Sequence, residues 1–285
     1  MKEFGCRVEY LEFDNEEEIA SFVLANLDTV DVVIDATEHL AARSKSLTWM
    51  PVPEAVQAKL GQLRPEVKRI MDGLPTKCRV PYLAGTTGIV YRSDLTKEPT
   101  SWADLYAAER SACLDSANST FMADFCYRKI PFTEVDEKQV QLSTRSLRDW
   151  LASGRVVSVT ADLEQIEELL VYGKVSMALM WSGDALRMRA AHSEVPLNYR
   201  IPQEGGDFFC EGWLVNPRTR HADLAWSFTQ FLLRPEIQVR LCKALHYQVA
   251  TQEALELLRK KHPDMANDPG VEPPAAVLQR CGDST

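Results

Sequence analysis

Short apolar runs alternate with segments of helical spacing from the start of the chain. Residues 8–13 alternate between apolar and charged side chains, which predicts a half-buried strand. Asp14 or Asn15 is then placed to cap a helix over residues 16–24, and residues 30–34 form a second apolar run. Two strands joined by a helix predict one β-α-β unit with parallel strands.

The same alternation continues through the middle of the chain. Residues 81–91 are rich in β-branched and aromatic side chains around a predicted turn at Gly85-Thr86-Thr87-Gly88, and a new lobe is expected to begin near here. Ser101 and Asp104 have the spacing of a capping box that opens a helix. Further strands are predicted at 112–114, 156–159 and 175–181, and helices at 121–127, 140–151 and 163–172.

The last third predicts one more strand and a helical region. Residues 212–215 are expected to form a strand that returns to the first lobe. Apolar positions between Ala225 and Leu232 recur at helical spacing, and Pro235 opens another helix. Residues 267–274 are proline-rich and predicted to be irregular. This order of elements is typical of an α/β protein with largely parallel sheets, and 285 residues favour two lobes.

Composition narrows the classes of function. A formal charge of −9 opposes binding to nucleic acid, because phosphate contacts require clustered lysine and arginine. No run is apolar enough for a membrane span, and the N-terminus lacks the pattern of a signal peptide. The seven cysteines show no C-x-x-C spacing, which favours free and mostly buried thiols.

Motifs for catalysis or for metal binding are also missing from the sequence. The five histidines lack metal-ligand spacing, and there is no H-E-x-x-H, G-x-S-x-G or G-x-G-x-x-G motif. The glycine-flanked turn at 85–88 suits a strand turn better than a phosphate cradle. We therefore expect a protein that is not an enzyme and that needs no cofactor and no metal.

Five strings occur in the order found in the bacterial spermidine/putrescine-binding proteins. They are VPYLAGTTGI at 80–89, TSWADL at 100–105, MWSGDA at 180–185, IPQEGG at 201–206 and FLLRPE at 231–236. Together they give a resemblance that covers roughly residues 5–255. The resemblance implies a type II, Venus-flytrap solute-binding protein of an ABC importer, located in the periplasm, with a small organic cation bound between two lobes joined by crossing strands. The expected boundaries are 1–93 and 210–250 for lobe 1, and 94–209 and 251–285 for lobe 2.

The resemblance also implies a binding site. An alkyl-ammonium ligand needs carboxylates for its charge and aromatic faces for its methylenes. Matched onto the family pattern, Trp181, Phe209 and Tyr247 would be aromatic walls, and Asp184 and Glu211 would meet one ammonium head. Each residue has a plain structural alternative: Trp181 in the core, Asp184 as a helix cap, Glu211 as a solvated residue, and the other two as packing.

Departures from the family pattern bear on the ligand. Thr37 and Glu38 stand where many members carry a serine followed by an aromatic residue. Ser119 stands where members carry a carboxylate for the far ammonium, so that end lacks its counter-charge unless Glu38 or Asp115 reaches it. A monoamine, an amino acid derivative and a putrescine-like molecule held differently all remain open.

A further departure lies at the N-terminus. The family begins with a strand and a helix that bear a Trp-x-x-Tyr motif, and this sequence starts just after them. This predicts an incomplete first lobe, with Met1 either an internal start or an artificial boundary. An open sheet edge of this kind allows a homodimer. The same fold also occurs as the ligand-sensing domain of a membrane signalling protein, so a fused signalling domain is the alternative partner to an ABC permease.

Overall fold

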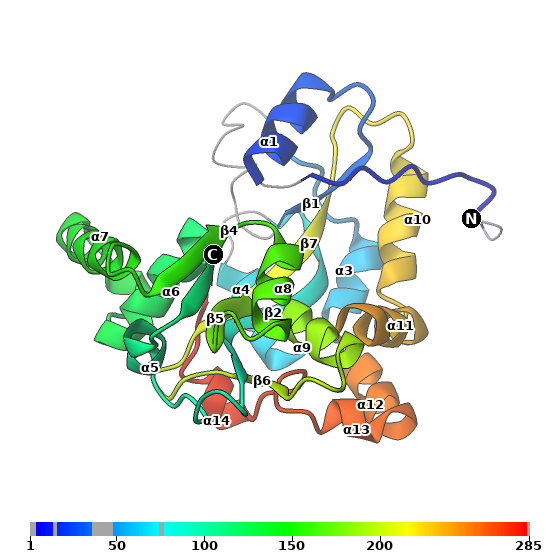
Figure 1. The fold of residues 1–285 in the computed structure, drawn as a ribbon. Coiled ribbons are helices and arrows are strands. Elements are labelled where there is room, and N and C mark those ends of the chain that lie inside the picture. Colours follow the sequence, from blue (N-terminus) through cyan, green and yellow to red (C-terminus); the bar gives the residue numbers. More distant parts are fainter. Residues whose placement is uncertain (1–3, 14–15, 36–47, 74–76, 284–285) are drawn as a thin grey trace.

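The computed structural model describes residues 4–13, 16–35, 48–73 and 77–283, shown in Figure 1. The helices are α1 (Glu16–Ala25), α3 (Glu54–Leu60), α4 (Pro65–Gly73), α5 (Trp102–Ala107), α6 (Ala117–Arg128), α7 (Glu137–Leu151), α8 (Leu163–Val171), α9 (Ser182–Ala191), α10 (Ala222–Leu232), α11 (Pro235–Leu245), α12 (Gln252–Lys261), α13 (Pro263–Ala266) and α14 (Ala275–Leu278), with a 3-10 turn at Phe132–Glu134. The strands are β1 (Val32–Asp35), β2 (Arg79–Arg92), β3 (Ser111–Leu114), β4 (Val156–Thr160), β5 (Met177–Trp181), β6 (Leu197–Arg200), β7 (Asp207–Val215) and β8 (Gly282–Asp283). None of the described helices combines the length and the apolar character that crossing a bilayer requires.

One eight-stranded sheet runs through the molecule in the order β1-β7-β2-β5-β3-β4, with β6 on β2 and β8 on β7. The first half of β2 pairs with β7, and its second half pairs with β5 and β6. We call the part around β1, β7 and the first half of β2 the first lobe, and the part around β3, β4, β5 and the second half of β2 the second lobe. The two-lobed α/β architecture is as predicted, while the residue boundaries of the lobes stay predictions.

The prediction of largely parallel sheets was wrong. Parallel pairing joins β3 to β4 and β5, and β7 to β8, whereas every pairing of β2 and the β1–β7 pairing is antiparallel. The long strand β2 and the returning strand β7 run in opposite directions through the middle of the sheet. A chain that crosses between lobes and returns beside itself produces this antiparallel centre.

The predicted turn at residues 85–88 was also wrong, because β2 continues through it without a break. Gly85 and Gly88 allow neighbouring groups to pack closely against the strand. A Cβ at Gly85 would lie 2.8 Å from Phe209 Cζ and from the Tyr247 ring, and one at Gly88 would lie 2.6 Å from the Arg200 carbonyl oxygen. Glycine inside a strand often marks a close approach of neighbouring groups, which is its role here.

In the first lobe, both faces of the sheet are covered. Val33 packs against a cluster with α1, and Val32 and Ile34 pack against a cluster that contains Trp213 and α10. Figure 1 shows α1 and α10 at the β1 end of the molecule. The prediction of a strand at 8–13 was wrong, because residues 6–13 belong to no strand of the structure. The predicted parallel β-α-β unit is therefore not formed, because alternation makes a segment suitable for a strand without supplying its partner.

The second lobe has a single large core. Fully buried Trp102, Ile166 and Leu179 belong to it, and helices α5 to α8 surround its strands. The predicted capping box is confirmed: the Ser101 hydroxyl accepts a hydrogen bond from the Ala103 amide, and the Asp104 carboxylate accepts one from the Ser101 amide. Caps of this kind stabilise a helix start by about 1 kcal/mol.

The C-terminal helices close the underside of the molecule. Arg64, at the start of α4, forms a bidentate ion pair with Glu272, with two N–O distances of 2.7 Å. Burial raises the pKa of the Glu272 carboxyl above its ordinary value, against the opposing effect of Arg64. Residues 267–274 lie between α13 and α14 without regular structure, as predicted.

Candidate functional site

The junction of β5 and α9 places two predicted site residues within one turn of chain. Trp181 ends β5 and is partly buried, and Asp184 lies in the first turn of α9. Asp184 is not a helix cap, because Trp181 holds the cap position and makes no side-chain cap bond. The Asp184 carboxylate instead accepts a hydrogen bond from the Tyr247 hydroxyl at 2.5 Å and lies 3.3 Å from the Arg187 guanidinium.

Tyr247 covers the start of α9. It follows His246, whose left-handed backbone (φ 58°) ends α11 and turns the chain. A Cβ at Gly183 would lie 2.3 Å from two Tyr247 ring carbons, so only glycine allows the ring to lie there. The Tyr247 and Phe209 rings meet edge to face, with centroids 6.0 Å apart and an interplanar angle of 66°.

Two carboxylates act on the Tyr247 hydroxyl. Burial raises the pKa of Tyr247 well above its ordinary value, and the negative charges of Asp184 and Glu211 raise it further. Glu211 is partly buried in β7, two residues after Phe209, so both side chains point to the same face of the strand. Burial raises the pKa of Tyr82 to about 12, with smaller contributions from Tyr10 and Glu211. The carboxylates of Asp184 and Glu211 therefore both act on the Tyr247 end of the aromatic pair.

Trp181 makes its polar contact with α6. Its indole Nε1 donates a hydrogen bond to the Ser119 hydroxyl at 3.0 Å, and the Ser116 and Ser119 hydroxyls are 3.0 Å apart. Ser119 is buried in the first turn of α6, whose cap is Ser116. The structure thus pairs Ser119 with Trp181 and presents a neutral hydroxyl where the family pattern places a carboxylate.

The remaining predicted residues are Asp115, Thr37 and Glu38. Asp115 is exposed at the end of β3, and its backbone amide donates a hydrogen bond to the Thr160 carbonyl oxygen at 2.9 Å. Thr37 and Glu38 lie outside the described residues. No group of three or more potential metal ligands occurs in the part of the chain that the structure describes.

Three features of the site were not predicted from the sequence. Gly85 and Gly183 make the space that Tyr247 fills, and Tyr82 lies near Glu211. Gly85 and Gly183 both lie inside the strings that resemble the family, and this could have indicated that they belong to the site. Tyr247 lies far from Gly85 and Gly183 in the sequence, so no local pattern indicated that its ring packs against both glycines.

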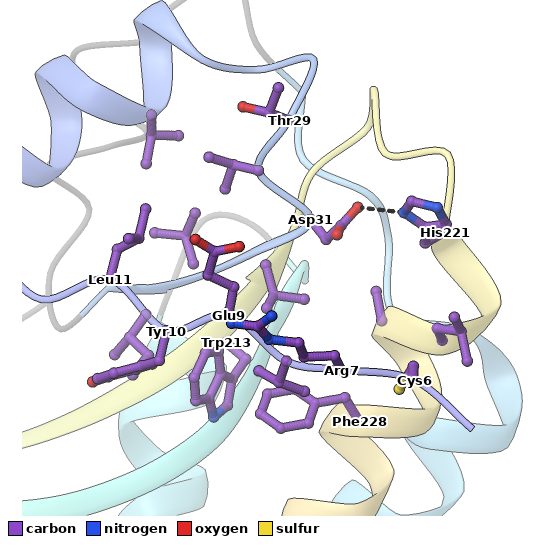
Figure 2. Close-up of a pocket in the computed structure, with 18 of the residues that line it drawn as sticks. Cys6, Arg7, Glu9, Tyr10, Leu11, Thr29, Asp31, Trp213, His221 and Phe228 are labelled. Atoms are coloured by element: carbon purple, nitrogen blue, oxygen red, sulfur yellow. Dashed lines mark hydrogen bonds and ion pairs between the residues drawn. The ribbon is translucent and has the colours of Figure 1, made fainter. Parts of the chain in front are cut away.

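A large pocket lies next to Glu211. It has a volume of about 1040 Å³ and is lined by the N-terminal segment 4–13, by β1 and by α1, β7 and α10. Figure 2 shows Trp213 and Phe228 below the N-terminal segment, and Asp31 joined to His221. The pocket is thus between elements of the first lobe and extends to the carboxylate of the site.

Known proteins resemble the chain along its full length. The spermidine/putrescine-binding periplasmic protein of Salmonella typhimurium is 25% identical over 287 residues, covering 98% of this chain and 79% of that protein. The substrate-binding protein PotD of the Streptococcus pneumoniae spermidine/putrescine ABC transporter superposes with a TM-score of 0.83 at 20% identity, covering 100% of this chain and 86% of that one. The Atu4243-GABA receptor gives a TM-score of 0.77 at 20% identity, covering 100% and 84%.

The first two are named as spermidine/putrescine-binding proteins, and the third as a GABA receptor. The resemblance found in the sequence is therefore confirmed, together with the two-lobed fold. The family model for bacterial extracellular solute-binding proteins matches residues 1–273, and the chain belongs to that family.

Proposed function

We propose that this protein captures a small organic cation of the putrescine and spermidine class in the cleft between its lobes and delivers it to an ABC importer in the periplasm. The observation that carries this proposal is the convergence of Asp184 and Glu211, from different lobes, on the aromatic pair Tyr247 and Phe209. Carboxylates beside ring faces are the groups that an alkyl-ammonium requires, and each cation–π contact contributes about 0.5–2 kcal/mol.

Binding alone accounts for this activity, with no covalent step. Asp184 belongs to the second lobe and Glu211 to the first, so a cation that contacts both stabilises the closed arrangement over the open one. The names of the relatives favour import over sensing, so the permease, rather than a fused signalling domain, is the partner of the proposal.

The far end of the site, at Trp181, is neutral. Ser119 and the Trp181 indole form a neutral hydrogen-bonded pair there. A second buried ammonium at this point would lack a counter-charge among the described residues that contact Trp181, at a cost of several kcal/mol. A diamine of the proposed class would therefore have to hold its second ammonium away from the Trp181–Ser119 pair.

The test is a thermal-shift and calorimetric titration with putrescine, spermidine, cadaverine, 4-aminobutyrate, a monoamine of matched length and a sugar. A ligand at roughly one hundred times its Kd raises the free energy of unfolding by about 2.7 kcal/mol. Stabilisation by amines alone supports the proposal, and stabilisation by the sugar alone overturns it.

Two variants locate the site. Trp181→Ala and Glu211→Gln should each weaken amine binding at least about tenfold, because an aromatic face or a charge partner is lost. Glu109→Gln, a change at an exposed carboxylate of the second lobe, is the matched control and should bind as the unmodified protein does. Unchanged affinity in both site variants would refute the assignment of these residues.

A further inference from the structure

A second, smaller pocket lies in the second lobe. It has a volume of about 310 Å³ and is lined by residues of α5, α6, α7 and the segment that leads into β4. Figure 1 shows α5, α6 and α7 together at the left of the molecule. Tyr127, in the last turn of α6, lines the pocket, whereas Ser119, which bonds Trp181, lies in the first turn of the same helix. At about 1.5 Å per residue, these two positions are separated by about 12 Å along α6.

Three aromatic rings form the apolar walls of this pocket. The Tyr106 ring of α5 meets the Tyr127 ring edge to face, with centroids 5.4 Å apart, and the Trp150 ring of α7 with centroids 5.1 Å apart. Leu147 adds a buried aliphatic side chain to the lining. Pockets of a few hundred Å³ with mainly aromatic and aliphatic walls are typical of small-molecule sites, in which a few polar groups fix the orientation of the ligand.

Two hydrogen-bond donors on these rings lack an acceptor. The Tyr106 hydroxyl and the Trp150 indole Nε1 are both buried, and neither bonds to any residue that the structure describes. Trp150 is only 7% exposed, so bulk water does not solvate its indole freely. A buried donor without an acceptor destabilises a fold. An acceptor atom inside the pocket would supply what both donors lack.

The charges of the lining argue against a cationic ligand. Asp149 and Arg155 contribute one carboxylate and one guanidinium, so the lining has no net charge. An ammonium group carries donors and no acceptor, and it therefore cannot satisfy the two unpartnered donors. The pocket thus differs from the cleft site, where carboxylates lie beside the aromatic rings.

A buried carboxylate behind the pocket argues against an anionic ligand. Burial is the main cause that raises the pKa of the Tyr106 hydroxyl above its ordinary value, and the negative charge of Asp124 is the next largest. Asp124 keeps this effect although the Arg128 Nε lies 2.6 Å from its carboxylate. A carboxylate placed at the Tyr106 hydroxyl would meet the same negative charge, whereas an uncharged acceptor would not.

We propose that this pocket binds a small, uncharged ring compound with an amide group, such as an aromatic carboxamide or a lactam. The amide oxygen has two lone pairs and accepts hydrogen bonds from both the Tyr106 hydroxyl and the Trp150 indole, while the ring lies among the aromatic walls. The amide N–H donors have the exposed Asp149 carboxylate as an acceptor at the rim. The inference goes beyond the proposed function and does not depend on it.

The test uses three probes that share one ring and differ in a single substituent: benzamide, benzoate and benzylamine. Nuclear magnetic resonance of isotope-labelled protein follows the indole N–H signal of Trp150, which is assigned by its loss in Trp150→Phe. Benzamide should shift this signal in a saturable way and bind at least about tenfold more tightly than either charged probe, because it alone is an uncharged acceptor. A fragment of this size binds weakly, in a range that such titrations measure.

Two matched variants test the role of the donors. Tyr106→Phe removes one donor and keeps the ring, and it should weaken benzamide binding roughly three- to tenfold. The same change should leave the free protein at least as stable, because an unsatisfied buried donor is removed, so weaker binding would not reflect unfolding. Tyr172→Phe, at a tyrosine that is 72% exposed, is the control and should bind benzamide as the unmodified protein does.

Three results would overturn the inference. They are a preference for benzoate or benzylamine over benzamide, benzamide binding that Tyr106→Phe leaves unchanged, and a Trp150 signal that does not move with benzamide up to its solubility limit. The last result would mean that water satisfies the two donors. The titration is made on protein without amine, so its outcome is distinguishable from that of the amine titration.

Discussion

Strands β1 and β5 have similar lengths and opposite surroundings. β5 lies inside the sheet, paired with β2 and β3, and four of its five residues are buried. Among the strands that the structure describes, β1 pairs only with β7, and its residues line the large pocket of the first lobe. The comparison shows that an apolar run makes a strand possible, while its neighbours on both sides decide how much it stabilises the fold.

The largest expected effect comes from matched truncations in the two strands. Leu179→Ala in β5 should lower the free energy of unfolding by about 4 kcal/mol, because Leu179 is fully buried. Ile34→Ala in β1 removes the same number of carbon atoms from a partly buried site that lines the large pocket of the first lobe, and should cost about 1–2 kcal/mol. Urea unfolding measures both. Equal losses would contradict the comparison.

Amide exchange sharpens the comparison without mutation. The amides of β5 should exchange through global unfolding, whereas the β1 amides that do not bond to β7 should exchange through local opening, at least about a hundredfold faster. Mass spectrometry of peptides that contain Val32–Asp35 and Met177–Trp181 measures this. Comparable protection in the free protein would mean that the β1 edge is already covered.

A smaller effect is expected at the end of β5. Ser119→Ala removes the acceptor of the Trp181 indole and should lower stability by about 1–2 kcal/mol, because a partly buried donor is left unsatisfied. Ser158→Ala breaks only the exposed 3.3 Å bond to Gln165 and should change stability by less than about 0.5 kcal/mol. A Ser119→Ala variant as stable as the control would show that this hydrogen bond is not needed to hold Trp181.

The smallest effect concerns pH. The hydrogen bond to Glu167 raises the pKa of His192, which follows α9, and Glu194 adds to the shift. A raised folded-state pKa stabilises the protein fully below the unfolded value of about 6.5, and this contribution is lost as pH rises through the folded value. The loss should be a few tenths of a kcal/mol, because the pair is near the surface. Urea unfolding across this pH range measures the loss, which should be absent in His192→Gln. If the unmodified protein instead became more stable as pH rises through this range, the assignment to His192 would be contradicted.

The sequence predicted the local features best. The capping box at Ser101, strand β5 and the α/β class follow from periodicity and cap chemistry, which are properties of neighbouring residues. The turn predicted at Gly85 was wrong. Glycine is needed there because Phe209 and Tyr247, which are distant in sequence, pack against this position. The strand predicted at 8–13 failed for a related reason, since pairing needs an edge that the segment itself does not contain.

The site divides in the same way. Resemblance named Trp181, Asp184, Phe209, Glu211 and Tyr247, and the structure brings Asp184, Phe209 and Tyr247 into contact. The bond between Trp181 and Ser119 depends on how α6 packs beside β5, which no local pattern encodes. Their roles toward a ligand stay predictions that the titrations above address.

The position of β7 has a consequence for biosynthesis. Val32 of β1 pairs with Val215 of β7, and the first half of β2 also pairs with β7, which is synthesised later. At ribosomal rates of about 5–20 residues per second, roughly 10–40 s separate the emergence of these partners. During that interval the nascent first lobe is expected to expose its apolar strands, so it should depend on chaperones far more than the second lobe, whose strands β3, β4 and β5 are made in close succession.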